Sequence, residues 1–281
     1  MKLNFKISKI CNFKFNLAES PVYDENNKIL FIIDINKKIL FEYNLENKKH
    51  NKIKFDQKIG FAKLLNKKTL VLGFENKIIY FDILKKKTIK IFSIKKFSKN
   101  LRTNDGDLDK NKNIFFGMYD KKKKYNGGLF VFNSRTKKFS KILGRLNTPN
   151  GPCFDKKKMN FYFTDTSKKM IYFFFKKKNL FQKKIFKDLS YSLAHNERPD
   201  GMTIDKKNNL WVCFYGSNYI RVYNKYSKEI LKIKFPCKNI TNCTFDNSYK
   251  NLFVTTARAK LSNQEKKENP DSGSIFVLNI K

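Results

Sequence analysis

The stretch RPDGMTIDKKNNLWVCFYGSNYIRVYNKYSK, residues 198–228, shows the pattern that decides the fold. Its Pro199-Asp200-Gly201 triplet is typical of a tight turn, because proline fixes φ, aspartate bonds to nearby backbone and glycine takes a positive φ at little cost. Two apolar runs follow, LWVCFY at 210–215 and IRVY at 220–223, and polar residues separate them. Short runs without helical periodicity predict antiparallel strands joined by hairpins.

The same unit recurs along the whole chain at intervals of roughly 40 to 50 residues, the period of propeller blades. The counterparts of its first run are LFIIDI (30–35), LVLGFE (70–75), IFFGMY (114–119), FYFTDT (161–166), LWVCFY (210–215) and LFVTTA (252–257). We therefore expect an all-β fold: a six-bladed β-propeller with four-stranded antiparallel blades around a central channel, as one domain over residues 1–281. The N-terminal strand LNFKISKI (3–10) is expected to complete the last blade and leave no long open edge.

The formal net charge of +37 admits two interpretations, a nucleic-acid or acidic-membrane binder and a set of solvated lysine loops. Lysine clusters recur along the whole chain, mostly where turns are expected, and only six of the 61 basic residues are arginine. A dedicated binding patch would be local and would favour arginine. The distribution therefore favours lysine loops, and we expect no specific nucleic-acid partner and no membrane partner.

The five cysteines include no CxxC pair, which argues against a disulfide framework and a zinc ribbon. The N-terminal segment lacks a continuous apolar core of the kind found in signal peptides, and the longest apolar runs are too short to span a membrane. These features predict a cytoplasmic protein.

A polar residue leads the first strand of five of the six units, and an aspartate follows it five positions later. The leading residues are Glu19, Asn104, Asn150, Thr241 and, from the opening stretch, Asp200. The trailing aspartates open a turn and are expected to bond to its backbone. First strands of propeller blades line the channel, so the leading residues should converge near one end of it. Either a hard divalent cation or a hydrated polar channel would account for such a ring. With only two histidines, a histidine triad or a three-histidine metal site is disfavoured.

Several segments, in order and over nearly the whole chain, resemble the gluconolactonase/regucalcin (senescence marker protein) family of six-bladed β-propeller lactonases. They are AESPVYD, LFIIDI, RTNDGDLD, NGGLFVFN, PNGPCFD, FYFTDT, RPDGMTID, NNLWVCFYG, NLFVTTARAKLS and GSIFVL. The chain departs from the family at Ala18-Glu19-Ser20-Pro21, where the family has Gly-Glu-Gly-Pro, and at FFGMYD (115–120), where it lacks a residue of the family's pattern.

The resemblance implies that Glu19, Asn150 and Asp200 bind one divalent metal ion (Ca, Zn, Mn, Mg or Fe(II)). It implies that Asp200 is also the catalytic base and that Arg102 and Asn104 bind the substrate, and it points to Asp120 as a further substrate contact. Such a metal polarises a lactone carbonyl and activates water. The expected function is hydrolysis of an aldonolactone to the sugar acid, by a monomer or weak homo-oligomer. The alternatives are a metal-binding propeller without lactonase activity and a hydrolase of another ester class.

Overall fold

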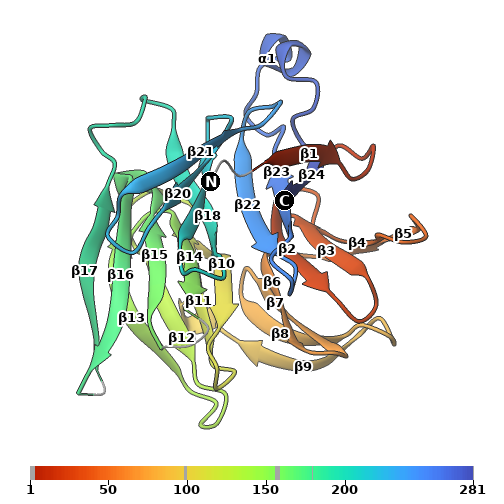
Figure 1. Cartoon of the computed structure of the whole chain (residues 1–281). Coiled ribbons are helices and arrows are strands. Elements are labelled where there is room, and N and C mark those ends of the chain that lie inside the picture. Colours follow the sequence, from red (N-terminus) through yellow and green to blue (C-terminus); the bar gives the residue numbers. More distant parts are fainter. Residues whose placement is uncertain (1–3, 98–99, 156–158, 179, 281) are drawn as a thin grey trace. The chain divides into compact units, whose positions relative to one another are not determined.

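The computed structural model of the chain describes residues 4–97, 100–155, 159–178 and 180–280, and this part contains six four-stranded antiparallel sheets (Figure 1). The expected all-β class and six-bladed β-propeller fold are thereby confirmed. The chain divides into two compact units, Met1–Lys58 with His195–Lys281, and Ile59–Ala194. The single domain over 1–281 stays a prediction. Among the described residues, no helix has the length and apolar character needed to cross a membrane.

The first unit holds three blades. One is formed by β2 (Ala18–Asp24), β3 (Ile29–Asp34), β4 (Ile39–Asn44) and β5 (His50–Lys54). The next is formed by β18 (Arg198–Ile204), β19 (Leu210–Tyr215), β20 (Tyr219–Tyr223) and β21 (Glu229–Lys234). The last is formed by β22 (Ile240–Phe245), β23 (Asn251–Thr256), β24 (Ile275–Ile280) and β1 (Phe5–Lys9).

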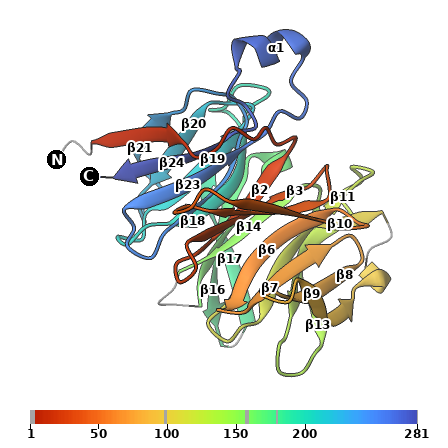
Figure 2. The same cartoon turned by 90° about the vertical axis from the view of Figure 1, so that its right-hand side faces the viewer.

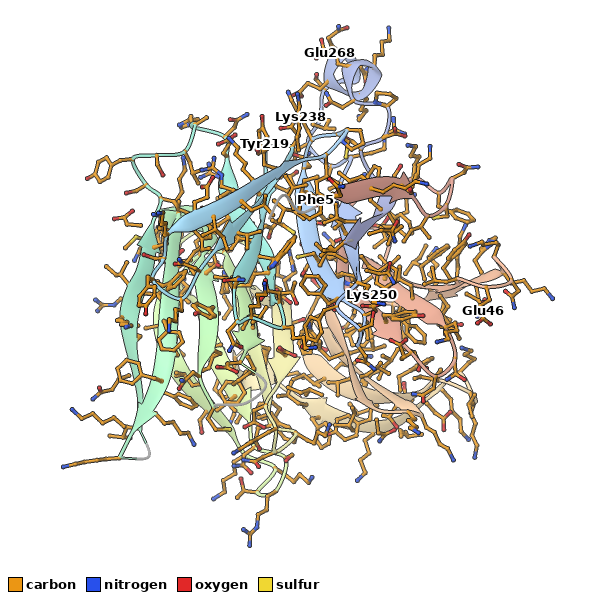
Figure 3. All side chains as sticks on the ribbon, in the orientation of Figure 1. Phe5, Glu46, Tyr219, Lys238, Lys250 and Glu268 are labelled. Carbon is orange, nitrogen blue, oxygen red and sulfur yellow. The ribbon has the colours of Figure 1, made fainter. Side chains whose placement is uncertain are left out.

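The last blade draws on both ends of the chain, as the sequence predicts. Strand β1 lies beside β24 (Figure 2), in a register that runs from Phe5 opposite Ile280 to Lys9 opposite Phe276. The same blade carries the short helix α1 (Asn263–Glu268), which Ser262 caps at its N-terminus. Lys238 lies at the base of this helix (Figure 3), and its ammonium is 3.4 Å from the Glu265 carboxylate.

The second unit holds the other three blades. The first comprises β6 (Ile59–Asn66), β7 (Thr69–Phe74), β8 (Lys77–Asp82) and β9 (Lys87–Ser93), and the short helix η1 (Lys95–Phe97) follows it. The second comprises β10 (Leu101–Leu108), β11 (Ile114–Asp120), β12 (Gly127–Phe132) and β13 (Phe139–Leu146). The third comprises β14 (Pro149–Phe154), β15 (Phe161–Asp165), β16 (Met170–Lys177) and β17 (Leu180–Asp188), with η2 (Thr166–Lys168) between its middle strands.

The six repeated apolar runs are the second strands of the blades. These strands are buried on both faces, as in β7, where every residue is buried. Their sequences are therefore continuous apolar runs rather than alternating ones. Outer strands face solvent, as in β9, where six of the seven residues are exposed and two of them are lysines. Lysine also occupies many turns: within the described residues, ten lysines have a positive φ, a left-handed conformation that glycine or asparagine adopts more easily.

All six first strands share a feature that the sequence analysis did not predict. The register against the second strand is interrupted near the leading position, for example between Glu19 and Val22 in β2 and between Asn150 and Cys153 in β14. Such β-bulges insert an extra residue and re-aim the side chains beside them. The bulges therefore set the directions of the candidate site residues.

Candidate metal and substrate site

Glu19 of the first unit lies at the bulge of β2 and is 7% exposed. Two neutral donors reach its Oε2 atom, the Ser20 backbone N–H at 3.1 Å and the Asn242 Nδ2 at 3.0 Å. Ser20 has φ 47°, a left-handed conformation in which a non-glycine residue costs about 1 kcal/mol or more. This is the position where the sequence departs from the family's glycine, so serine keeps the bulge at some cost in stability.

Asp200, near the start of β18 in the same unit, is also 7% exposed. The negative charges of Glu19 and Asp200 both affect the pKa of one buried thiol, that of Cys213 in β19. Burial, a hydrogen bond with Cys243 and the negative charges of Asp200 and Glu19 together raise the pKa of Cys213. The contacts of Asn242 agree with this: it donates to Glu19 at 3.0 Å and packs against Gly201, the residue after Asp200.

Asn242, the residue after Thr241 on β22, is the one that contacts Glu19, and the convergence of Thr241 with the other leading residues stays a prediction. The register of β22 shifts between Ile240 and Asn242, so Thr241 is the extra residue of the bulge. Its buried hydroxyl donates to the Ala18 carbonyl at 2.6 Å and lies 2.8 Å from the Thr255 hydroxyl. Asn242 takes the place beside Glu19. Only the bulge determines that Asn242, and not Thr241, contacts Glu19, and no single residue in the sequence indicates the bulge.

In the second unit, Asn104 of β10 and Asn150 of β14 form a directed pair. Asn104 Nδ2 donates to the Pro149 carbonyl at 2.9 Å and to Asn150 Oδ1 at 2.8 Å. Because a carbonyl only accepts, Pro149 fixes which end of the Asn104 amide is nitrogen, and Asn150 must then present its oxygen to Asn104. Asn150 Nδ2 donates a hydrogen bond to Thr166 Oγ1 at 2.7 Å.

A second link joins the same two strands. Asp105 follows Asn104, and its carboxylate accepts the Gly106 N–H at 2.7 Å and the Gly151 N–H at 2.9 Å. Burial raises the pKa of Asp105, while Lys63 and the two N–H donors act against that shift. Gly151 has φ 82°, which glycine alone adopts readily, and it directly follows Asn150. Asp105 therefore holds the bulge that carries Asn150, and the sequence analysis gave it no role.

Arg102 lies two residues before Asn104 on β10. Its guanidinium stacks on the ring of Tyr119, its cross-strand partner, at 4.7 Å, and it donates to the Thr103 carbonyl at 2.8 Å. Both Arg102 and Asn104 are partly exposed, while Thr103 between them is buried, so the two alternate onto one side of the strand. Asn104 and Asn150 are thus in direct contact in the second unit, and Arg102 lies on the same strand as Asn104.

Asp120, at the end of β11, is buried and organises the following turn. Its oxygens accept backbone N–H groups from Lys122 at 2.9 Å, Lys124 at 2.8 Å and Asn126 at 2.9 Å. Burial raises the pKa of Asp120, but these hydrogen bonds outweigh it and the net shift is downward. A substrate contact for Asp120 stays a prediction.

Each unit contains oxygen ligands of the kind that hard divalent cations prefer. The first unit has the buried carboxylates of Glu19 and Asp200, and the second has the oriented amide oxygen of Asn150. In the part of the chain that the structure describes, no three histidine, cysteine, aspartate or glutamate side chains cluster as metal ligands.

Comparison with known proteins agrees with this fold. Residues 17–258 match the family described as SMP-30/Gluconolactonase/LRE-like region. Regucalcin of Sus scrofa is 25% identical over 285 residues, which cover 98% of this chain and 94% of regucalcin. The solved calcium-binding protein regucalcin from Agrobacterium tumefaciens superimposes with a TM-score of 0.90 at 18% identity, over 99% of this chain and 95% of that chain. A gluconolactonase from Xanthomonas campestris gives a TM-score of 0.79 at 15% identity, over 99% and 90%.

Proposed function

Because the chain belongs to the SMP-30/gluconolactonase/LRE-like family, we propose that it hydrolyses a sugar lactone to the sugar acid with one divalent metal ion. The observation that supports this most directly is the pair of buried carboxylates, Glu19 and Asp200, which lie on either side of Asn242: its Nδ2 donates to Glu19 at 3.0 Å, and its amide packs against Gly201, the residue after Asp200. Two buried negative charges near one point are costly unless a cation compensates them. A divalent ion would compensate both.

Glu19, Asn150 and Asp200 are the proposed ligands of this ion. The choice among Ca, Zn, Mn, Mg and Fe(II) is open, because oxygen ligands suit several of these metals. When bound, the ion supplies positive charge that stabilises the oxyanion formed as water adds to the carbonyl. The two carboxylates and the neutral amide leave such a site near zero net charge, which is compatible with an uncharged lactone.

Asp200 is the proposed base. Its carboxylate takes a proton from water as the water oxygen bonds to the lactone carbonyl carbon. The ring C–O bond then breaks, and the departing alkoxide oxygen receives a proton, so one water is consumed and one hydroxy acid is formed. No oxidant, reductant or second substrate is needed.

Arg102 and Asn104 are the proposed substrate-binding residues, with different roles. The planar guanidinium of Arg102 offers several donors, and stacking on Tyr119 limits its motion. The Asn104 Nδ2 already donates to two acceptors, which uses both of its hydrogens. Asn104 therefore offers its Oδ1 to a sugar hydroxyl, as an acceptor.

The test is a metal-reconstitution assay. The purified protein is stripped of metal, single ions are restored, and acid release from a panel of aldonolactones is followed beside metal binding by calorimetry. Asp200→Asn should lower kcat by about 100-fold or more, the range of general-base contributions. Asp188→Asn, which removes an equal charge from an exposed position, is the matched control and should leave kcat unchanged.

The outcomes separate the candidate functions. Metal binding without hydrolysis above the spontaneous rate would overturn the lactonase proposal in favour of a metal-binding module. Cleavage of other esters but of no lactone would retain the proposal of a hydrolase and change its proposed substrate class. Wild-type kcat in Asp200→Asn would remove Asp200 as the base.

A further inference from the structure

The side chain of Asn242 connects three blades of the first unit. From β22, its Nδ2 donates to Glu19 Oε2 on β2 at 3.0 Å, and its Oδ1 accepts the Cys243 N–H at 2.8 Å. Because the Cys243 N–H can only donate, it fixes the amide oxygen on its own side, so the nitrogen must face Glu19. Asn242 is 4% exposed, and the contact is therefore shielded from competing water.

Gly201, directly after Asp200 on β18, makes room for this amide. A Cβ atom at position 201 would lie 2.2 Å from Asn242 Cγ and 2.5 Å from both Nδ2 and Oδ1. These distances are far inside van der Waals contact, so any larger residue would displace the amide. The glycine beside one carboxylate thus permits the hydrogen bond to the other.

We propose that Asn242 is a positioning residue, which orients the Glu19 carboxylate for a divalent cation. This inference rests on the proposed function in so far as Glu19 is a ligand. A neutral amide suits this role, because it fixes the carboxylate by a hydrogen bond and leaves its negative charge for the cation, which a lysine or arginine would neutralise. Partners of this kind behind metal ligands are worth about 10- to 100-fold in metal affinity or activity.

The second unit contains a counterpart with opposite hydrogen-bonding polarity. Asp105 precedes its trailing aspartate by four residues, as Asn242 does. It also reaches the next blade's bulge, where its Oδ2 accepts the Gly151 N–H beside Asn150. The Asp105 carboxylate accepts a hydrogen bond from a backbone N–H, whereas the Asn242 amide donates one to a carboxylate. This match between residue type and target favours a specific positioning role over simple filling of space.

Calorimetric titration of the metal-stripped protein with Mn²⁺ and with Ca²⁺ tests the proposal without relying on activity. Asn242→Ala should weaken binding about 10-fold or more. The matched control is Asn251→Ala in the same blade, which also removes an amide–carboxylate hydrogen bond, from Asn251 Nδ2 to Asp246 Oδ2 at 2.8 Å, but at a turn. It should leave the metal affinity unchanged.

A double-mutant cycle keeps the test decisive if Asn242→Ala folds poorly. Gly201→Ala retains the amide but displaces it, and should also weaken metal binding. In the Asn242→Ala background the added methyl meets none of its three nearest contacts, so its effect should largely vanish. Additive effects, or wild-type affinity in both single variants, would overturn the proposal.

Lactone hydrolysis measured on the same samples separates this proposal from the proposed function. Weakened metal binding in Asn242→Ala with no hydrolysis by the wild type would support the positioning role and end the lactonase proposal. Hydrolysis by the wild type with unchanged metal affinity in Asn242→Ala would do the reverse. A wild-type protein that binds neither ion would overturn the positioning role.

Discussion

Replacing Thr241 by valine removes one buried hydroxyl while the size of the side chain changes little. The hydroxyl is fully buried, donates to the Ala18 carbonyl at 2.6 Å and contacts the Thr255 hydroxyl at 2.8 Å. Loss of a partner for a buried polar group costs about 1–3 kcal/mol, and we take about 2 kcal/mol here. For a chain of 281 residues that corresponds to a fall in melting temperature of about 3–4 °C.

Urea titration and thermal melting of Thr241→Val measure this effect. Thr88→Val, at an exposed position of β9, is the control and should change the free energy of unfolding by about 0.5 kcal/mol or less. The reasoning fails if Thr241→Val is as stable as Thr88→Val. It also fails if the variant loses metal affinity while keeping its stability, because Thr241 would then face the ligand, as its place in the repeat first indicated.

Two further predictions concern other parts of the chain. Asp205 accepts the Nε1–H of Trp211, the only tryptophan, at 3.0 Å and the Asn209 N–H at 2.9 Å. Asp205→Ala should therefore lower the free energy of unfolding by about 2 kcal/mol or more and change the tryptophan fluorescence. Urea unfolding curves and emission spectra identical to those of the wild type would contradict this. Cys11 alone of the five free thiols is not buried, so a thiol reagent should modify one cysteine in the native protein, and Cys11→Ser should abolish that reaction. Burial raises the pKa of Cys11, so its thiolate forms only at higher pH, and the rate of its modification should still increase at pH values above the pKa of an ordinary thiol. Fast modification of a second cysteine would show that another thiol is accessible and would contradict the burial of the other four.

The blades could be predicted because short stretches of sequence determine where their strands and turns lie. A second strand such as β7 is buried on both faces and needs a continuous apolar run. Trailing aspartates could be assigned to turns because their side chains bond to nearby backbone: Asp24 accepts the Asn26 N–H at 3.0 Å and Asp246 accepts the Lys250 N–H at 3.0 Å. Residues 156–158, for which the sequence predicts the turn after Asp155, lie outside the described residues.

The directions of the site side chains could not be predicted in the same way. A shift of one residue turns a strand's side chains to its other face, and the bulge in β22 makes that shift between Ile240 and Asn242. Asp105 was missed for a related reason, since its partner is a backbone N–H on another blade. The ligand roles of Glu19, Asn150 and Asp200 came from the family resemblance and stay predictions.

The pairing of β1 with β24 has a consequence for the order in which the chain folds. Strand β1 is synthesised first, but its partner ends at Ile280, so it must wait for nearly the whole chain. The second unit is continuous in sequence, from Ile59 to Ala194, and finds all its strand partners earlier. Closing a loop of this length costs on the order of 5 kcal/mol of chain entropy. We therefore expect the last blade to close late, and at high concentration the β1 of one molecule to compete for the β24 of another.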